Sequence, residues 1–244
     1  MRPKQFRVAA TSVVACALAA PLHGELLTNG GFDLEPSFGA GVLGDAGYSA
    51  LTGDQIPGWT IEAGHAATVH NTALYPTITG PYTINLDGEG YQGVNANLYQ
   101  DFPSLLCAPY RLAFDWQGWV ASSTPRLDVS VVDTVTGEVL VSLNTGFDAN
   151  LHHEVLSFHG TGNVLRLRVR ENPESGSNDN AFLVDNFSVV QLKGKGPDLN
   201  GDGAVNAKDL AMLLGLWGGC GADFDGDGVT GASDLAVMLG AWTG

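Results

Sequence analysis

The strongest constraint in this sequence is an acidic, glycine-rich segment near the C-terminus that occurs twice, 25 residues apart. The first copy, residues 198–209, reads DLNGDGAVNAKD, and the second, residues 223–234, reads DFDGDGVTGASD. Each copy has oxygen-bearing side chains at positions 1, 3 and 5, a glycine at position 6 and an acid at position 12. That is the spacing of an EF-hand-type calcium loop, with aspartate in place of the usual glutamate at position 12. Because the two copies match in register, we prefer calcium loops to an ordinary acidic turn.

Calcium takes six to eight oxygen ligands, so a short loop must turn tightly, and the glycine at position 6 permits that turn. The predicted ligands of the first loop are Asp198, Asn200, Asp202, the carbonyl of Ala204, Asn206 and Asp209. Those of the second loop are Asp223, Asp225, Asp227, the carbonyl of Val229 and Asp234, with a water in place of the side chain that Gly231 lacks. We therefore predict two calcium ions in residues 198–244.

An amphipathic run follows each loop. Large apolar residues recur at i, i+3, i+4 and i+7, first at Leu210, Leu213, Leu214 and Trp217 and again at Leu235, Met238, Leu239 and Trp242. This period predicts two short helices whose apolar faces pack against each other. So small a segment buries little core, and its carboxylates repel one another, so calcium is the expected folding cofactor.

The duplicated motif resembles a type I dockerin over residues 198–244. The resemblance implies two half EF-hands, each a loop and one helix, that dock onto a cohesin-like domain of a scaffold or cell-surface protein. It also implies a link to polysaccharide degradation, because such modules are commonly joined to enzymes or binding modules that act on plant polysaccharides. At loop positions 10 and 11, where dockerin recognition falls and hydroxyl residues are frequent, this chain has Ala207-Lys208 and Ala232-Ser233.

The chain begins with a basic and then an apolar stretch. The uncharged run 8–20 follows three basic residues, Arg2, Lys4 and Arg7. This run is shorter than the roughly 20 residues of a membrane-spanning helix. This pattern predicts a signal peptide over residues 1–24, a secreted or cell-surface protein and no transmembrane segment. Composition changes near residue 193, so we divide the remainder into a domain at 25–192, a linker at 193–197 and a second domain at 198–244.

Short alternating runs separated by turn residues dominate residues 25–192 and predict an antiparallel β-sandwich. Leucine and valine recur at every second position in residues 127–131 and 165–169, so these side chains face one surface of a sheet. Arg166, Arg168 and Arg170 then face the other surface, where we expect them to pair with acids on neighbouring strands. The predicted fold is mainly β, with a small α-helical domain at the C-terminus.

Three short segments resemble a secreted galactose-binding-like jelly-roll family that includes many carbohydrate-binding modules. They are LLTNGGFD at 26–33, IPGW at 56–59 and FLVDNFSV at 182–189. The resemblance implies that the first and last strands lie together and share a structural calcium, held by Asp33 and Asp185. Strand parity predicts that Asp185 points inward with Phe187, where an unpaired carboxylate is costly. The alternative to calcium there is a carboxylate capped by backbone amides.

Sugar recognition needs an aromatic ring beside polar groups, because a pyranose has an apolar face and a rim of hydroxyls. The candidate ligand-binding residues are Trp119, Tyr91 and Tyr99, for which ordinary core packing is the alternative. Trp119 has the opposite parity to a set of apolar residues on the same run, so it is expected on the other face of the strand. The residues assigned to the core are Trp59, Leu112, Phe114 and Trp116.

No nucleophile elbow, Cys/His catalytic motif or phosphate loop occurs, so we lean towards a non-catalytic protein. The cluster His152-His153-Glu154 is predicted to be a solvated turn, because adjacent residues of a strand point to opposite faces and cannot chelate one ion together. The chain has 11 Lys and Arg against 26 Asp and Glu, a formal net charge of −15. Nucleic acid and anionic membrane are therefore excluded as favoured partners.

Two cysteines lie outside the predicted signal peptide, Cys107 and Cys220. They fall in different predicted domains, and we do not expect a bridge between them. Two thiols do not make a disulfide scaffold, so the small C-terminal domain must gain stability elsewhere.

The leading hypothesis is a secreted, calcium-dependent adaptor without catalytic activity. Its sandwich would bind a glycan or another surface component, and its dockerin-like tail would fix it to a cohesin-like partner. The first alternative is a small glycoside hydrolase or other polysaccharide-active enzyme carried by the same tail. The second alternative is a structural surface or matrix protein.

Overall fold

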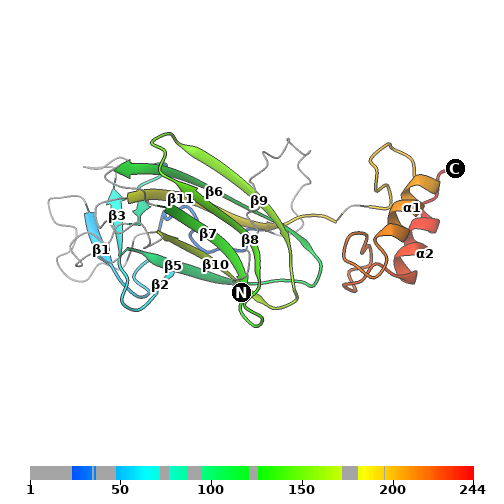
Figure 1. Cartoon of the computed structure of the whole chain (residues 1–244), viewed down its shortest axis with the longest axis horizontal. Coiled ribbons are helices and arrows are strands. Elements are labelled where there is room, and N and C mark those ends of the chain that lie inside the picture. The colour runs from blue at the N-terminus through cyan, green and yellow to red at the C-terminus, as the bar shows by residue number, and fades with distance from the viewer. Residues whose placement is uncertain are drawn as a thin grey trace, which may run out of the picture.

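The computed structural model describes residues 24–34, 36, 48–71, 77–86, 95–120, 126–171, 181–194 and 196–244. The predicted signal peptide, apart from residue 24, and the candidate Tyr91 lie outside these residues. Within them, two antiparallel sheets pack into a sandwich and two short helices follow near the C-terminus (Figure 1). The prediction of a mainly β chain built on an antiparallel sandwich is confirmed. Neither helix in the described part is long and apolar enough to cross a membrane.

The first sheet has six strands in the order β1-β3-β4-β11-β6-β9, and the second has five in the order β2-β5-β10-β7-β8. The strands of the six-stranded sheet are β1 (Tyr48–Leu51), β3 (Ala67–Asn71), β4 (Tyr82–Asn85), β11 (Ala181–Gln191), β6 (Pro109–Val120) and β9 (His152–His159). Those of the five-stranded sheet are β2 (Thr60–Ile61), β5 (Asn97–Pro103), β10 (Val164–Glu171), β7 (Arg126–Asp133) and β8 (Val139–Gly146).

The core lies between the two sheets and is filled by alternate residues of their strands. On β7 and β10 the residues predicted to face inward are fully buried, namely Leu127, Val129, Val131, Leu165, Leu167 and Val169. On β6, Leu112, Phe114 and Trp116 belong to the same core, as predicted. Burial of this apolar surface is the main stabilising term for the sandwich, at about 25 cal/mol per Å² removed from water.

The segments LLTNGGFD, IPGW and FLVDNFSV meet in one aromatic cluster. The ring of Phe32 lies 5.3 Å from that of Trp59 and 6.1 Å from that of Phe187. Trp59 is buried, as predicted, and its indole N–H donates to the carbonyl of Asn29 at 3.1 Å. The turn needs a glycine at Gly30, because a Cβ there would overlap the carbonyl oxygen of Phe187. These contacts fasten the first described residues to the last strand.

The C-terminal module, residues 198–244, has a small apolar core of its own. Its helices α1 (Ala207–Gly215) and α2 (Ala232–Gly240) lie side by side beyond one end of the sandwich (Figure 1). The buried apolar residues of the module are Leu199, Val205, Leu213, Ala222 and Met238.

Two backbone pairings join the halves of this module. The amide of Thr243 donates to the carbonyl of Val205 at 3.0 Å, and the amide of Gly218 donates to the carbonyl of Thr230 at 2.9 Å. Each loop is therefore tied to the segment that follows the helix of the other loop. The sequence repeat thus becomes a repeat in structure, with the two halves exchanging equivalent contacts.

The helices bury less than the sequence predicted. Leu213 and Met238 are fully buried, but Leu214 and Trp217 are 54% and 48% exposed. Their equivalents Leu239 and Trp242 are 53% and 39% exposed. The two helices meet as predicted, but only part of each apolar run is buried between them. Two helices of nine residues meet along a narrow row of side chains, and the neighbouring apolar row remains in solvent.

A disulfide joins Cys107, in the turn between β5 and β6, to Cys220, between α1 and the second loop. The expectation that these cysteines are not bridged is wrong. Their Cα atoms are 5.1 Å apart, within the range that a disulfide spans. Folding brings the turn against the second loop, where Leu106 lies against Gly228. A cross-link between residues of two predicted domains depends on this contact, which cysteine counting does not reveal.

Candidate functional site

The first predicted calcium loop is shaped by hydrogen bonds from its own backbone to predicted ligand side chains. Asp198 accepts from the amide of Gly201 at 2.8 Å and, on its other oxygen, from that of Gly203 at 2.9 Å. Asn200 accepts from the amide of Asp202 at 2.8 Å. Gly203 has φ of +88°, a conformation that glycine adopts without strain. These bonds curl the backbone around the oxygens of the loop.

The second loop repeats this network 25 residues later. Asp223 accepts from the amides of Gly226 at 2.7 Å and Gly228 at 2.9 Å, and Asp225 accepts from that of Asp227 at 3.1 Å. Gly228 has φ of +94°, matching Gly203. Four carboxylates of this loop each bring one oxygen within 4.8 Å of the others, namely Asp223, Asp225, Asp227 and Asp234. Such a cluster could hold one metal ion.

The aspartates at position 12, Asp209 and Asp234, are fully buried and also start the helices. Asp209 accepts from the amide of Asn206 at 2.9 Å, and Asp234 accepts from that of Gly231 at 2.7 Å. The other oxygen of each accepts an amide near the start of its own loop. Capping the first turn of a helix with a carboxylate satisfies amides that have no partner inside the helix. One side chain therefore closes each loop and begins the helix that follows.

Several of these carboxyl groups are held in the ionised form. The hydrogen bond from Lys208 lowers the pKa of Asp202, and a backbone amide lowers the pKa of Asp209. In the second loop, a hydrogen bond from Ser233 lowers the pKa of Asp225. Ionised carboxylates, amide oxygens and backbone carbonyls are the ligands that calcium takes. The donor set of both loops therefore fits calcium.

Asp185 was predicted to face the core with Phe187, but it faces the other side of its strand. A bulge in β11 between Asp185 and Ser188, with Asn186 at φ +55°, changes which residues of the strand point inward. Phe187 consequently faces the core together with Val184, and Asp185 faces the outer side of the six-stranded sheet. Parity counted along the sequence fails here because a bulge inserts an extra residue on one strand.

Asp185 is nevertheless fully buried, and hydrogen-bond donors surround its carboxylate. It accepts from the hydroxyl of Thr83 at 2.8 Å, the amide of Asn186 at 2.8 Å and the amide of Thr79 at 3.2 Å. Burial is the largest effect on this group and raises the pKa of Asp185 to about 6. Two of these donors are backbone amides, the kind of partner expected if Asp185 is a capped carboxylate.

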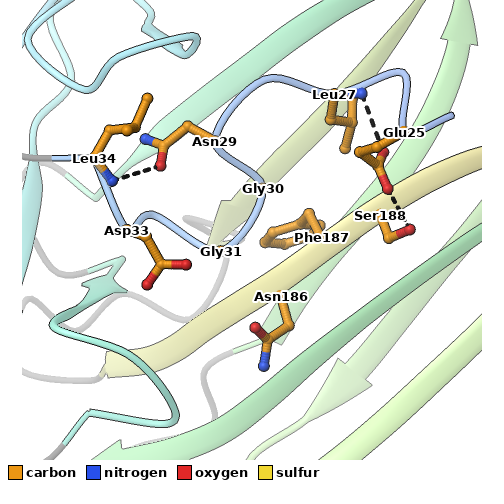
Figure 2. Close-up of a pocket in the computed structure, with 10 residues that line it drawn as sticks. All are labelled: Glu25, Leu27, Asn29, Gly30, Gly31, Asp33, Leu34, Asn186, Phe187 and Ser188. Atoms are coloured by element: carbon orange, nitrogen blue, oxygen red, sulfur yellow. Dashed lines mark hydrogen bonds between the residues drawn. The ribbon is translucent and has the colours of Figure 1, made fainter.

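Asp33 lies close to the same turn. It is exposed, and one of its oxygens lies against Gly80, the residue after Thr79. Figure 2 shows Asp33 on one side of Gly31 and Asn186 on the other, in a cleft of about 550 Å³. A calcium ion shared by Asp33 and Asp185 therefore stays a prediction.

A second cleft, of about 600 Å³, opens on the outer face of the five-stranded sheet and contains the candidate Tyr99. The guanidinium carbon of Arg166 lies 3.6 Å from the centroid of the Tyr99 ring, and Asp101 holds this guanidinium through two hydrogen bonds of 2.7 Å and 2.9 Å. Glu62 and His65 also line the cleft. Sequence reasoning missed these neighbours, because only the pairing of β5 with β2 and β10 brings them beside Tyr99. An aromatic ring among several polar groups suits a small polar ligand.

Trp119 lies on the outer face of the six-stranded sheet, as its parity predicted, and is half-buried. Its ring meets that of His70 edge to face, with centroids 5.4 Å apart. His70 is buried, and its Nε2 lies 3.1 Å from the side-chain nitrogen of Asn85. Trp119 thus belongs to a second group of aromatic and polar side chains. His70 and Asn85 carry no sequence motif, so the sequence did not point to them.

His152, His153 and Glu154 begin β9, so the predicted solvated turn is wrong. The two histidines point to opposite faces of this strand, as expected for neighbours in a strand. The ring of His152 stacks on Trp116 at a centroid distance of 4.2 Å, whereas Nδ1 of His153 lies 2.6 Å from a carboxylate oxygen of Asp115.

No protein-family model and no curated protein matches this chain. Among solved structures, an arabinose-bound α-L-arabinofuranosidase, MgGH51, is 14% identical with a TM-score of 0.47, covering 68% of this chain and 26% of that one. The module TmCBM61 in complex with β-1,4-galactotriose is 15% identical with a TM-score of 0.41, covering 68% and 98%. The CBM22-1 xylan-binding domain of Paenibacillus barcinonensis Xyn10C is 13% identical with a TM-score of 0.41, covering 74% and 100%. The chain spans about a quarter of the arabinofuranosidase, and likenesses this distant do not identify its family.

Proposed function

We propose that this chain is an extracellular binding protein in which the sandwich holds a glycan and the calcium-loaded C-terminal module docks onto a second protein. The observation that carries the proposal is the matched pair of loops. Their backbones are curled by the same hydrogen bonds, and their helical segments leave equivalent apolar side chains in solvent. The two features together suit a module that is ordered by metal and then covered by a partner.

Calcium is the cation that this donor set suits. The side chains that would hold it are Asp198, Asn200, Asp202 and Asp209 in the first loop and Asp223, Asp225, Asp227 and Asp234 in the second. When bound, the ion neutralises carboxylates that otherwise repel one another. Because the ligands converge only in the folded loops, binding and folding of the module are expected to be coupled.

The docking surface is a pair of equivalent apolar patches on the helices. The exposed residues at matching repeat positions are Met212 and Val237, Leu214 and Leu239, and Trp217 and Trp242. Apolar patches of this kind on a small soluble module mark protein interaction sites, and tryptophan is frequent among residues that dominate binding energy. The dockerin resemblance supplies the class of partner, a cohesin-like domain on a scaffold or at the cell surface.

Affinity capture from the envelope of the secreting cell, with the full-length chain immobilised in calcium or in chelator, tests the docking. We expect a cohesin-like protein that is retained in calcium and released by chelator. A Leu214→Ala, Leu239→Ala double variant should lose this protein. The control variant Leu151→Ala changes a similarly exposed leucine of the sandwich, immediately before β9, and should retain the protein. Retention that ignores both calcium and the double variant would contradict the proposal.

The glycan part rests on the cleft that contains Tyr99, where an aromatic ring can lie beneath a sugar and polar groups can bond its hydroxyls. A glycan array followed by calorimetry tests it. We expect Tyr99→Ala to abolish binding and Tyr99→Phe, which keeps the ring, to retain most of it. Loss confined to Trp119→Ala would move the site to the six-stranded sheet, and an array without any ligand would contradict glycan binding.

A further inference from the structure

Three arginines alternate along the outer face of β10 in a chain whose formal net charge is −15. Arg166 makes two hydrogen bonds with Asp101, at 2.7 Å and 2.9 Å, and Arg170 pairs with Asp128 at 3.0 Å. The prediction that all three arginines pair with acids on neighbouring strands holds for these two.

Arg168, between them, is different. Among the described residues it has no ion pair and no hydrogen-bond partner, and its Nε, like that of Arg170, is buried without an acceptor. A buried N–H without an acceptor costs free energy, and a partly desolvated cation favours a nearby anion. An acidic chain has many carboxylates to place beside an arginine, so the unpaired state of the central arginine is a specific feature of this face.

One neighbour of Arg168, Tyr99, lines the cleft described above, although Arg168 itself does not. In the sheet register Arg168 lies opposite Tyr99 on β5 and opposite Ser130 on β7. Directly opposed residues on neighbouring strands have Cβ atoms about 5 Å apart, so the guanidinium stem lies beside the aromatic ring and a hydroxyl. A ligand seated on Tyr99 is therefore within reach of Arg168.

The acids of this face do not occupy Arg168. Asp101 and Asp128 are engaged by Arg166 and Arg170, and Glu62 accepts a hydrogen bond from the side chain of Asn97 at 2.6 Å. Arg168 is thus the arginine of β10 that has no acidic partner within the described residues. An anionic group on a ligand would complete the pairing that the protein leaves open.

We infer that this face binds an acidic polysaccharide, with the ring of a uronic acid residue on Tyr99 and its carboxylate on Arg168. A guanidinium fork matches a planar carboxylate through two parallel hydrogen bonds, which it cannot make to a neutral hydroxyl. Because the Arg166 guanidinium covers one face of the Tyr99 ring, the opposite face would support the apolar face of the sugar. The inference rests on the proposed glycan binding and names the glycan class that the site selects.

The test compares polygalacturonate with its methyl-esterified form and with a sulfated polysaccharide, using calorimetry on the full chain in calcium. Wild type is expected to prefer the free carboxylate at least tenfold and to lose that preference as salt is raised. Arg168→Gln should weaken binding to polygalacturonate about tenfold or more and leave binding to the ester unchanged. Arg126→Gln, which removes an exposed arginine that bonds Asn144 on the same sheet, is the matched control and should bind like wild type.

The outcomes separate this inference from the proposed function. Binding of neutral glycans with no preference for the acidic form, or an Arg168→Gln variant with normal affinity for polygalacturonate, would overturn the inference and leave glycan binding standing. Equal binding of the sulfated polysaccharide would overturn the assignment to a carboxylate. Absence of binding to every polysaccharide would contradict both this inference and the proposed glycan binding. An unchanged thermal midpoint of Arg168→Gln, checked by circular dichroism, shows that any loss is not a loss of fold.

Discussion

Cys107 and Cys220 form a disulfide across a sequence separation of 113 residues and connect the β5–β6 turn of the sandwich to the segment after α1. Beside this bond, Leu106 lies against Gly228, whose amide donates to the first aspartate of the second loop at 2.9 Å. The sandwich therefore supports the second acidic loop, residues 223–234. The structure gives the first loop no equivalent cross-link in the described residues.

This cross-link predicts how the chain behaves after cleavage in the linker. Trypsin cutting after the exposed Lys193 should give two fragments. On a denaturing gel these fragments should migrate together without reductant and separately with it. In Cys107→Ser the fragments should separate in both conditions. Closing a loop of about 100 residues stabilises a fold by up to about 4–5 kcal/mol, so this variant should also unfold at lower denaturant. Fragments of the unreduced wild-type protein that separate would contradict the bond.

Calcium stoichiometry is the second prediction. Calorimetry on the whole chain should give two ions. Asp198→Asn or Asp223→Asn should each reduce the number to one or weaken one site about tenfold or more, because a charged ligand is lost and the asparagine keeps only one of the two oxygens that accept backbone amides. Asp54→Asn, an exposed acid in the sandwich, is the control and should bind two ions. Two normal sites in either loop variant would contradict the ligand assignment.

Neighbouring leucines on α1 should differ sharply in their effect on stability. Leu213→Ala removes a fully buried side chain and should destabilise the module by about 2–4 kcal/mol. Leu214→Ala removes a side chain that is 54% exposed and should cost less than about 1 kcal/mol. Helical circular dichroism during denaturation in saturating calcium measures both. Similar losses in the two variants would show that the helices pack along a different row.

The stability of the sandwich should depend on pH because Asp185 changes its protonation state on folding. Its pKa is about 6 in the folded chain and near 3.8 for the free group, so the folded state keeps a proton that the unfolded state has released. Folding therefore takes up a proton between about pH 4 and pH 6, and stability contributed at low pH is lost as pH rises through this window, by at most about 3 kcal/mol.

Asp185→Asn tests this assignment. The variant should lose the slope of thermal midpoint against pH between about 4 and 6, whatever its absolute stability, and Asp54→Asn should keep it. Calcium held by Asp33 and Asp185 would favour the ionised carboxylate, so the slope of wild type should vanish on adding calcium if that predicted site exists. A slope that persists in Asp185→Asn would assign it to another group.

Parts of the fold followed directly from local pattern. The alternation over residues 127–131 and 165–169 identified which side chains enter the core, because the side chains of a strand point to opposite faces in turn. The same rule failed at Asp185, where a bulge inserts a residue. The turn predicted at His152-His153-Glu154 was wrong for a different reason, because these residues begin β9, an edge strand of the six-stranded sheet. Local pattern also overstated burial in α1 and α2, because an amphipathic stripe shows which face is apolar and not how much of it a neighbour covers.

The sequence by itself determined where the two candidate calcium loops lie, since every predicted ligand of a loop falls within twelve consecutive residues. Only the tertiary structure decided what lies around Tyr99 and Arg168, which residues Asp185 meets and which thiol Cys107 reaches. Those relationships join residues far apart in the chain. Strand order, register and bulges bring them into contact, and no short stretch of sequence predicts these features.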